Sequence, residues 1–241
     1  MKMDIRVFPD IEALSRAALE ELLLTLRDAI SARGHFAIAL SGGHTPAKLY
    51  LLWAHAEEYG VRTPWERVHL FWSDERYVPH DDPASNYGMT RETLISRVPI
   101  PEGNVHPMPT SLASPEEAAK AYEAELKKFF AASPPEFDLQ LLGLGVEGHT
   151  ASLFPGSPAL EETQRWVAAV EVPADPPVRL TLTSVVLNCG RKTIFLVTGK
   201  DKHPVIGSLR EGSAAQRGQF PAGRILPKGS VFWFLDQAAA G

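Results

Sequence analysis

The sequence predicts an α/β protein with an open, mainly parallel β-sheet and helices on both faces of that sheet. Short runs rich in apolar and β-branched residues alternate with longer segments whose apolar residues recur every three or four positions. Glycine or polar turns follow several of the apolar runs, as expected where strands lead into crossover helices. The chain has 241 residues, of which 44% are hydrophobic and 22% charged. This length and balance predict a single domain over residues 1–241.

The first half of the chain contains three expected strand and helix units. The expected strands are 3–8, 35–40 and 67–72, and the expected helices run from 11 to at least 30, over 47–60 and over 86–98. Asp10 is expected to cap the first helix and Gly34 to end it. Ser85 or Asn86 is expected to cap the third helix, and the polar segment 73–85 is expected to be a long loop.

The second half is expected to complete the same sheet. Ser114 and Glu117 have the spacing of a capping box, with Pro115 at the first helical position, so a helix is expected to run from there to Phe129. The remaining expected strands are 137–145, 166–172, 178–183, 192–199 and 230–235, with a short helix near 204–210.

The composition argues against several kinds of partner. The formal net charge of -5 gives no long-range attraction to nucleic acid or anionic lipid, so a phosphate would have to be captured by a local pocket. No apolar run approaches the roughly 20 residues that cross a bilayer. The start of the sequence has no secretory leader, and the single cysteine, Cys189, lies in an apolar run and is expected to be structural. We expect a cytoplasmic protein without nucleic-acid or membrane partners.

The segment S-G-G-H-T-P at 41–46 follows an expected strand, which is where parallel sheets bind ligands. Paired glycines allow backbone N–H groups to approach an anion, and the next helix presents its positive end. The segment therefore predicts a phosphate site formed by Ser41, Gly42, Gly43 and Thr45, although a tight turn without a ligand has the same pattern. Neither the Walker pattern nor the dinucleotide fingerprint matches here, which disfavours a nucleotide cofactor.

Three further polar segments follow expected strands. Asp74 and Arg76 follow the expected strand 67–72, with one serine between that strand and Asp74. Glu147 and His149 are two residues apart in a glycine-rich turn, where a carboxylate can orient an imidazole that acts as a base. Two cations, Arg179 and Lys202, lie near the ends of strand-like runs and could hold a phosphate or be ordinary surface charges. No spacing of metal ligands is recognisable, so no metal site is expected.

These segments occur in a characteristic order: SGGHTP, SDERYVP followed by SN, GLGVEGHTASLFPG, RLT and VTGKDK. This order resembles the glucosamine-6-phosphate isomerase/6-phosphogluconolactonase family over nearly the whole chain. The resemblance implies a Rossmann-like parallel fold with a glycine loop for a sugar phosphate. The DER, VP and SN string is similar to that of the lactonases, whereas the deaminases have a glutamate where this chain has Phe154. Glu147 stands where the lactonase motif usually has aspartate.

The resemblance implies hydrolysis of 6-phospho-D-glucono-1,5-lactone, a step of the oxidative pentose phosphate pathway, without metal or cofactor. We expect His149 to deprotonate water, Glu147 to stabilise the imidazolium, and Arg76 or a glycine-loop N–H to stabilise the oxyanion. Asp74 is expected to contact sugar hydroxyls or to help move a proton.

Other mechanisms and functions remain open at this stage. A serine nucleophile is disfavoured because the sequence has no GxSxG elbow, and Ser152 follows the histidine motif instead. A deaminase-like aldose/ketose isomerase and a non-catalytic sensor of sugar phosphate are the alternatives. The expected quaternary structure is a monomer or a weak homo-oligomer.

Overall fold

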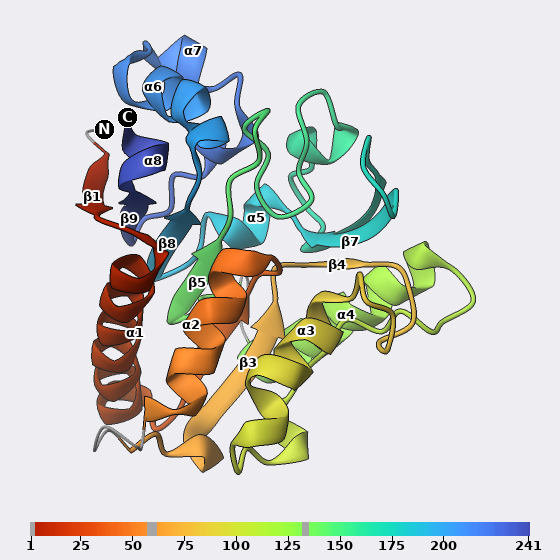
Figure 1. Ribbon diagram of the computed structural model, residues 1–241. Helices are drawn as coiled ribbons and strands as arrows, with labels where there is room; N and C mark the ends of the chain where they lie inside the picture. The colour runs from red at the N-terminus through yellow and green to blue at the C-terminus, as the bar shows by residue number, and fades with distance from the viewer. Residues whose placement is uncertain (1–2, 57–61, 132–134) are drawn as a thin grey trace.

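A parallel sheet forms the centre of the computed structural model, which describes residues 3–56, 62–131 and 135–241. Within these residues the sheet has six strands in the order β1-β9-β8-β5-β2-β3 (Figure 1), and every neighbouring pair is parallel. The strands are β1 (Asp4–Phe8), β2 (Phe36–Leu40), β3 (Val68–Trp72), β5 (Leu139–Leu142), β8 (Lys192–Val197) and β9 (Ser230–Asp236). The predicted α/β class with a mainly parallel sheet is confirmed.

The helices begin and end largely where local sequence signals predict. The α-helices are α1 (Ile11–Arg33), α2 (His44–Ala54), α3 (Asn86–Thr93), α4 (Pro115–Phe130), α5 (Ser184–Leu187), α6 (His203–Glu211), α7 (Ala214–Arg217) and α8 (Gln237–Ala240). Asp10 accepts a hydrogen bond from Ala13 N at 2.8 Å, and Gly34 ends α1 with a φ of 80°. Ser85 caps α3. Helix α2 begins within the SGGHTP segment, and residues 57–60 of its predicted extent lie outside the described residues.

The predicted loop at 73–85 is wrong at 74–76, and the expected strands at 166–172 and 178–183 do not join the main sheet. Asp74–Arg76 forms a strand, β4, which belongs to an antiparallel sheet of order β4-β7-β6 with β7 (Val178–Leu182) and β6 (Val167–Glu171). Ser73 N donates to Leu40 O at 2.8 Å, and Ser73 O accepts from Leu182 N at 2.8 Å. The chain therefore passes from one sheet to the other at Ser73, through long-range hydrogen bonds that a local pattern cannot predict.

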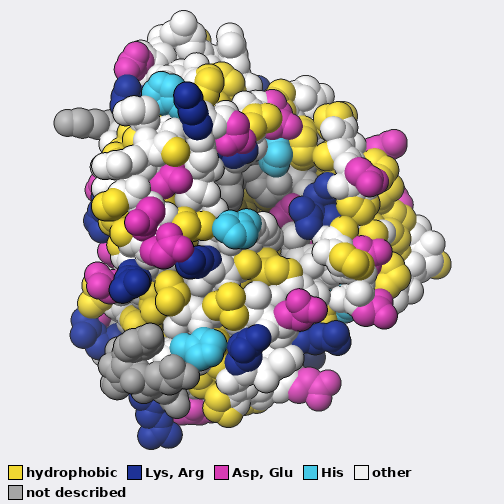
Figure 2. Space-filling model, viewed as in Figure 1, with side chains coloured by type: hydrophobic (Ala, Val, Ile, Leu, Met, Phe, Trp, Pro, Cys, Tyr) yellow, Lys and Arg dark blue, Asp and Glu magenta, His cyan; other side chains and the backbone are white. Residues whose placement is uncertain are grey.

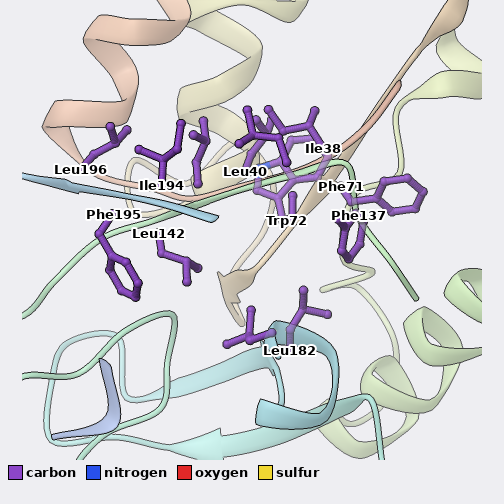
Figure 3. Close-up of a cluster of buried hydrophobic side chains, with 14 of the residues drawn as sticks. Ile38, Leu40, Phe71, Trp72, Phe137, Leu142, Leu182, Ile194, Phe195 and Leu196 are labelled. Atoms are coloured by element: carbon purple, nitrogen blue, oxygen red, sulfur yellow. The ribbon is translucent and has the colours of Figure 1, made fainter. Parts of the chain in front are cut away.

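The core occupies both sides of the parallel sheet. Figure 3 shows Ile194 and Leu196 on one side of β8 and Phe195 on the other, as the alternation of a strand requires. Leu182 of the antiparallel sheet lies on the same side as Phe195 (Figure 3), and all four side chains are buried. The second sheet therefore packs against the main sheet through apolar side chains.

Two buried tyrosines hold the strand ends that lead into polar segments. Tyr50 of α2 donates to Ser41 O at 2.9 Å and accepts from Ser41 N at 3.0 Å. Tyr122 of α4 contacts the backbone of Trp72 in the same way, at 3.0 Å from the nitrogen and 3.3 Å from the oxygen. Helices on the flanks of the sheet thus fix the backbone where β2 and β3 end. Among the described residues, none of the helices has the length and hydropathy of a membrane span.

Candidate active site

A cavity of about 270 Å³ lies where the carboxyl ends of the central strands meet the antiparallel sheet. Figure 2 shows a hollow in this part of the molecule, surrounded by histidine, basic and acidic side chains. Its lining residues are Ser41, Gly42, Asp74, Arg76, Asn86, Gly143, Leu144, Gly145, His149, Ala151, Arg179 and Lys202. All four predicted polar segments therefore contribute to one site. Of the predicted residues, Gly43, Thr45 and Glu147 are not in the lining and lie one to three positions along the chain from residues that are.

The N-terminus of α2 forms one end of the cavity. Its N-cap, Gly43, has a φ of 104°, a conformation that favours glycine. Within the described residues, no N-cap side chain accepts a hydrogen bond from the first N–H groups of this helix. The hydroxyl of Thr45 lies 2.7 Å from that of Thr198, and Ser41 Oγ is buried without a hydrogen-bond partner in the part of the chain that is described. Free N–H groups, the positive end of the helix dipole and a buried hydroxyl together suit a bound anion.

Asp74 is held in a fixed orientation by two residues that the sequence analysis did not assign to the site. Ser152 Oγ donates to Asp74 Oδ2 at 2.6 Å, and both residues are buried. Asn86 Nδ2 donates to Asp74 O at 2.9 Å and lies 3.4 Å from Asp74 Oδ1. The hydroxyl of Ser152 is therefore committed to a carboxylate, which further disfavours it as a nucleophile.

Glu75, between the two predicted site residues of its segment, has a structural position. Its carboxylate accepts from the backbone nitrogens of Asn86 and Tyr87, each at 2.7 Å, and of Arg76 at 2.8 Å. Burial raises the pKa of Glu75 to about 6, against the opposite effect of these hydrogen bonds. Glu75 thus satisfies the first N–H groups of α3 and positions Asn86 at the cavity.

Arg76 and Arg179 are direct partners in the β4 and β7 register, so two guanidinium groups enter the cavity side by side. Arg76 Nη1 donates to Ala84 O at 2.6 Å, and Arg179 Nε donates to Pro176 O at 2.6 Å. Burial, and then the charge of Arg76, lower the pKa of Arg179. Lys202 adds a third cation, with Nζ 2.8 Å from Asp201 Oδ2. The sequence could not show that Arg76 and Arg179 are neighbours, because β4 was not predicted.

His149 is held by packing more than by its carboxylate neighbour. Its Nδ1 lies 3.1 Å from Glu147 Oε2, yet this buried nitrogen has no hydrogen-bond partner within the described residues, since the alignment is unsuitable. The ring of Phe154 stacks on the imidazole, with centroids 3.9 Å apart and 15° between the planes. Glu147 and His149 are thus close enough for the charge of the carboxylate to act on the imidazole, although no hydrogen bond joins them within the described residues.

Three other histidines and the cysteine lie away from the cavity. His35, His69 and His106 form an aromatic cluster with Phe129 at the opposite end of the sheet, where β2 and β3 begin. Cys189 is partly buried, and burial raises the pKa of its thiol. Among the described residues, no group of three or more His, Cys, Asp or Glu side chains is arranged to hold a metal ion.

This chain is similar to known proteins over nearly its whole length. The model of the family described as glucosamine-6-phosphate isomerases/6-phosphogluconolactonase matches residues 9–233. A 6-phosphogluconolactonase from Synechocystis sp. is 43% identical, covering 99% of this chain and 98% of its own. The solved 6-phosphogluconolactonase from Trypanosoma brucei superposes with a TM-score of 0.86 at 33% identity, covering 99% and 98% of the two chains. A monomeric glucosamine-6-phosphate deaminase, 21% identical over 99% of each chain with a TM-score of 0.80, shares the fold.

Proposed function

Because the chain belongs to the glucosamine-6-phosphate isomerase/6-phosphogluconolactonase family, we propose that it hydrolyses 6-phospho-D-glucono-1,5-lactone to 6-phosphogluconate. One observation supports placing this reaction in the cavity described above. Three buried polar atoms without a hydrogen-bond partner among the described residues belong to residues that line this cavity: Ser41 Oγ, Arg76 Nε and Asn86 Oδ1. Buried polar atoms normally have partners, so their convergence indicates a polar ligand with several oxygens.

The proposed reaction begins with a water molecule at C1 of the lactone. His149 takes a proton from this water as its oxygen bonds to C1, and the carbonyl oxygen becomes an oxyanion stabilised by Arg76 or by an N–H of the glycine loop. The C1–O5 bond then breaks, and the proton held by His149 passes to the ring oxygen. Glu147, whose carboxylate is 3.1 Å from Nδ1, stabilises the transient imidazolium.

The phosphate is proposed to bind at the other end of the cavity. The N–H groups of Gly42, Gly43 and Thr45 and the hydroxyl of Ser41 would surround its oxygens at the start of α2. Arg179 and Lys202 would supply positive charge. The fixed carboxylate of Asp74 would accept hydrogen bonds from sugar hydroxyls.

The mechanism proposed here uses neither a metal nor another cofactor. The deaminase-like alternative is less well supported, because an apolar ring, Phe154, contacts His149 where a deaminase would have a carboxylate. We further propose that the protein acts in the cytoplasm as a monomer or weak homo-oligomer.

The first test is the rate of lactone disappearance compared with spontaneous hydrolysis. The chain should accelerate it with and without a chelator, and His149→Ala should lose at least about 10²-fold in kcat. Equal rates with and without the protein would contradict the function. Near-normal turnover by His149→Ala would contradict only the mechanism.

A second test separates the phosphate site from the chemistry. Charge-assisted hydrogen bonds contribute about 1.5–3 kcal/mol each, so Arg179→Ala or Lys202→Ala should weaken binding of the phosphorylated lactone roughly ten- to a hundredfold. Unphosphorylated gluconolactone should hardly be affected. Lys200→Ala, which removes an exposed lysine two residues from Lys202, is the matched control. Equal losses with both substrates would contradict this placement of the phosphate.

A further inference from the structure

The imidazole of His149 is enclosed on several sides. Phe154 is 5% exposed and stacks on it at 3.9 Å between centroids. A Cβ atom added to Gly145 would lie 2.0 Å from His149 Nδ1, so the backbone of Gly145 approaches this edge of the ring closely. Because Nδ1 is buried between Gly145 and Glu147, Nε2 is the nitrogen left to the cavity.

We infer that Phe154 is a positioning residue that sets the plane of the His149 ring and thereby aims Nε2 at the substrate. This inference rests on the proposed role of His149 as the base. The carboxylate of Glu147 cannot set the ring by itself, since it is 41% exposed and forms no aligned hydrogen bond to Nδ1 within the described structure. A stacked aromatic pair, by contrast, restricts rotation of the imidazole about its side-chain bonds and excludes water from one face.

The chemistry of a phenyl ring also suits this position. Phe154 has no polar atom, so it binds neither nitrogen of His149 and leaves both for Glu147 and for water. Its π-electron face lies against the imidazole, where it can stabilise the positive charge that the ring gains when it accepts a proton. An aliphatic residue of similar size would also leave both nitrogens free, but it would provide no π-electron face against the imidazole.

The test compares Phe154→Leu with Phe154→Tyr, which keeps the aromatic ring. We expect kcat of Phe154→Leu to fall about tenfold while KM changes less than twofold, because the groups proposed to bind the phosphate are at the other end of the cavity. Phe154→Tyr should recover most of kcat. The matched control is Phe220→Leu. Phe220 packs on Gly148, the residue before His149, and a Cβ added to Gly148 would lie 2.4 Å from the Phe220 ring. This control variant should lose thermal stability and keep kcat.

A second readout does not depend on turnover. The ring current of Phe154 should shift the NMR signals of the His149 ring protons upfield, and Phe154→Leu should remove this shift. The inference is overturned if Phe154→Leu retains the wild-type kcat, if it raises KM instead, or if Phe220→Leu loses kcat to the same extent. Wild-type protein that does not accelerate lactone hydrolysis would instead overturn the proposed function and, with it, the inference.

Discussion

The protein should lose stability in mild acid because of His69. Its imidazole lies at the start of β3, with Nδ1 3.2 Å from His106 Nε2 and the ring centroid 4.7 Å from that of Phe129. Burial, and then the neighbouring His106 and His35, lower the pKa of His69 from 6.5 to about 4. The folded chain therefore keeps this side chain neutral at pH values at which the unfolded chain protonates it.

The direction and size of the effect follow from these two pKa values. Between them the unfolded chain binds more protons than the folded chain, so the free energy of unfolding decreases as the pH falls from 6.5 toward 4. For this one side chain, the free energy of unfolding at pH 5 should be about 2 kcal/mol lower than at pH 8. Well above pH 6.5 the imidazole is neutral in both states, so His69 no longer changes the free energy of unfolding with pH.

Urea unfolding of the wild type and of His69→Gln at pH 8 and pH 5 measures this contribution. Glutamine does not bind a proton in this pH range, so the decrease in unfolding free energy between the two pH values should be about 2 kcal/mol smaller in the variant. Carboxylates and other histidines are present in both proteins. The pH-dependent decrease in unfolding free energy of the wild type, minus that of the variant, therefore reports on position 69. The same pH dependence in both proteins would refute the reasoning, whatever the absolute stability of the variant.

Two further predictions concern the residues that hold Asp74. Gly42→Ala would place a Cβ 1.8 Å from Asn86 Oδ1, so Asn86 must move. Because Asn86 bonds to the Asp74 carboxylate, kcat/KM should fall at least about tenfold, as for the loss of a hydrogen bond to a charged group. Gly42→Ala combined with Asn86→Ala should be non-additive in unfolding free energy, whereas additive losses would argue against the contact. Ser152→Ala removes a 2.6 Å hydrogen bond to a buried carboxylate and should cost about 1.5–3 kcal/mol in urea unfolding while retaining far more kcat than His149→Ala. A loss of kcat as deep as that of His149→Ala, with unchanged stability, would make Ser152 the nucleophile.

The residues that could be predicted from sequence are those whose signal is local. Asp10 and Gly34 have the side chain and backbone preferences of helix caps, and the structure has both at those positions. The Gly42 and Gly43 turn precedes a helix and so marks the end of a strand. Ser152 and Asn86 could not be assigned to Asp74 in this way, because their contacts join segments 78 and 12 residues apart. Such contacts exist only after the chain has crossed between sheets at Ser73.

That crossing also explains why the site has its electrostatic character. The antiparallel register sets Arg76 opposite Arg179, an arrangement of like charges that destabilises a sheet on its own. Asp74 offsets part of this repulsion, but its two oxygens face Ser152 and Asn86. Together with Lys202, the arginines leave the cavity short of negative charge. A phosphorylated lactone would bring that charge, together with oxygens that can bond to the buried polar atoms. The groups that lower the stability of the fold are therefore those that would select an anionic, oxygen-rich ligand.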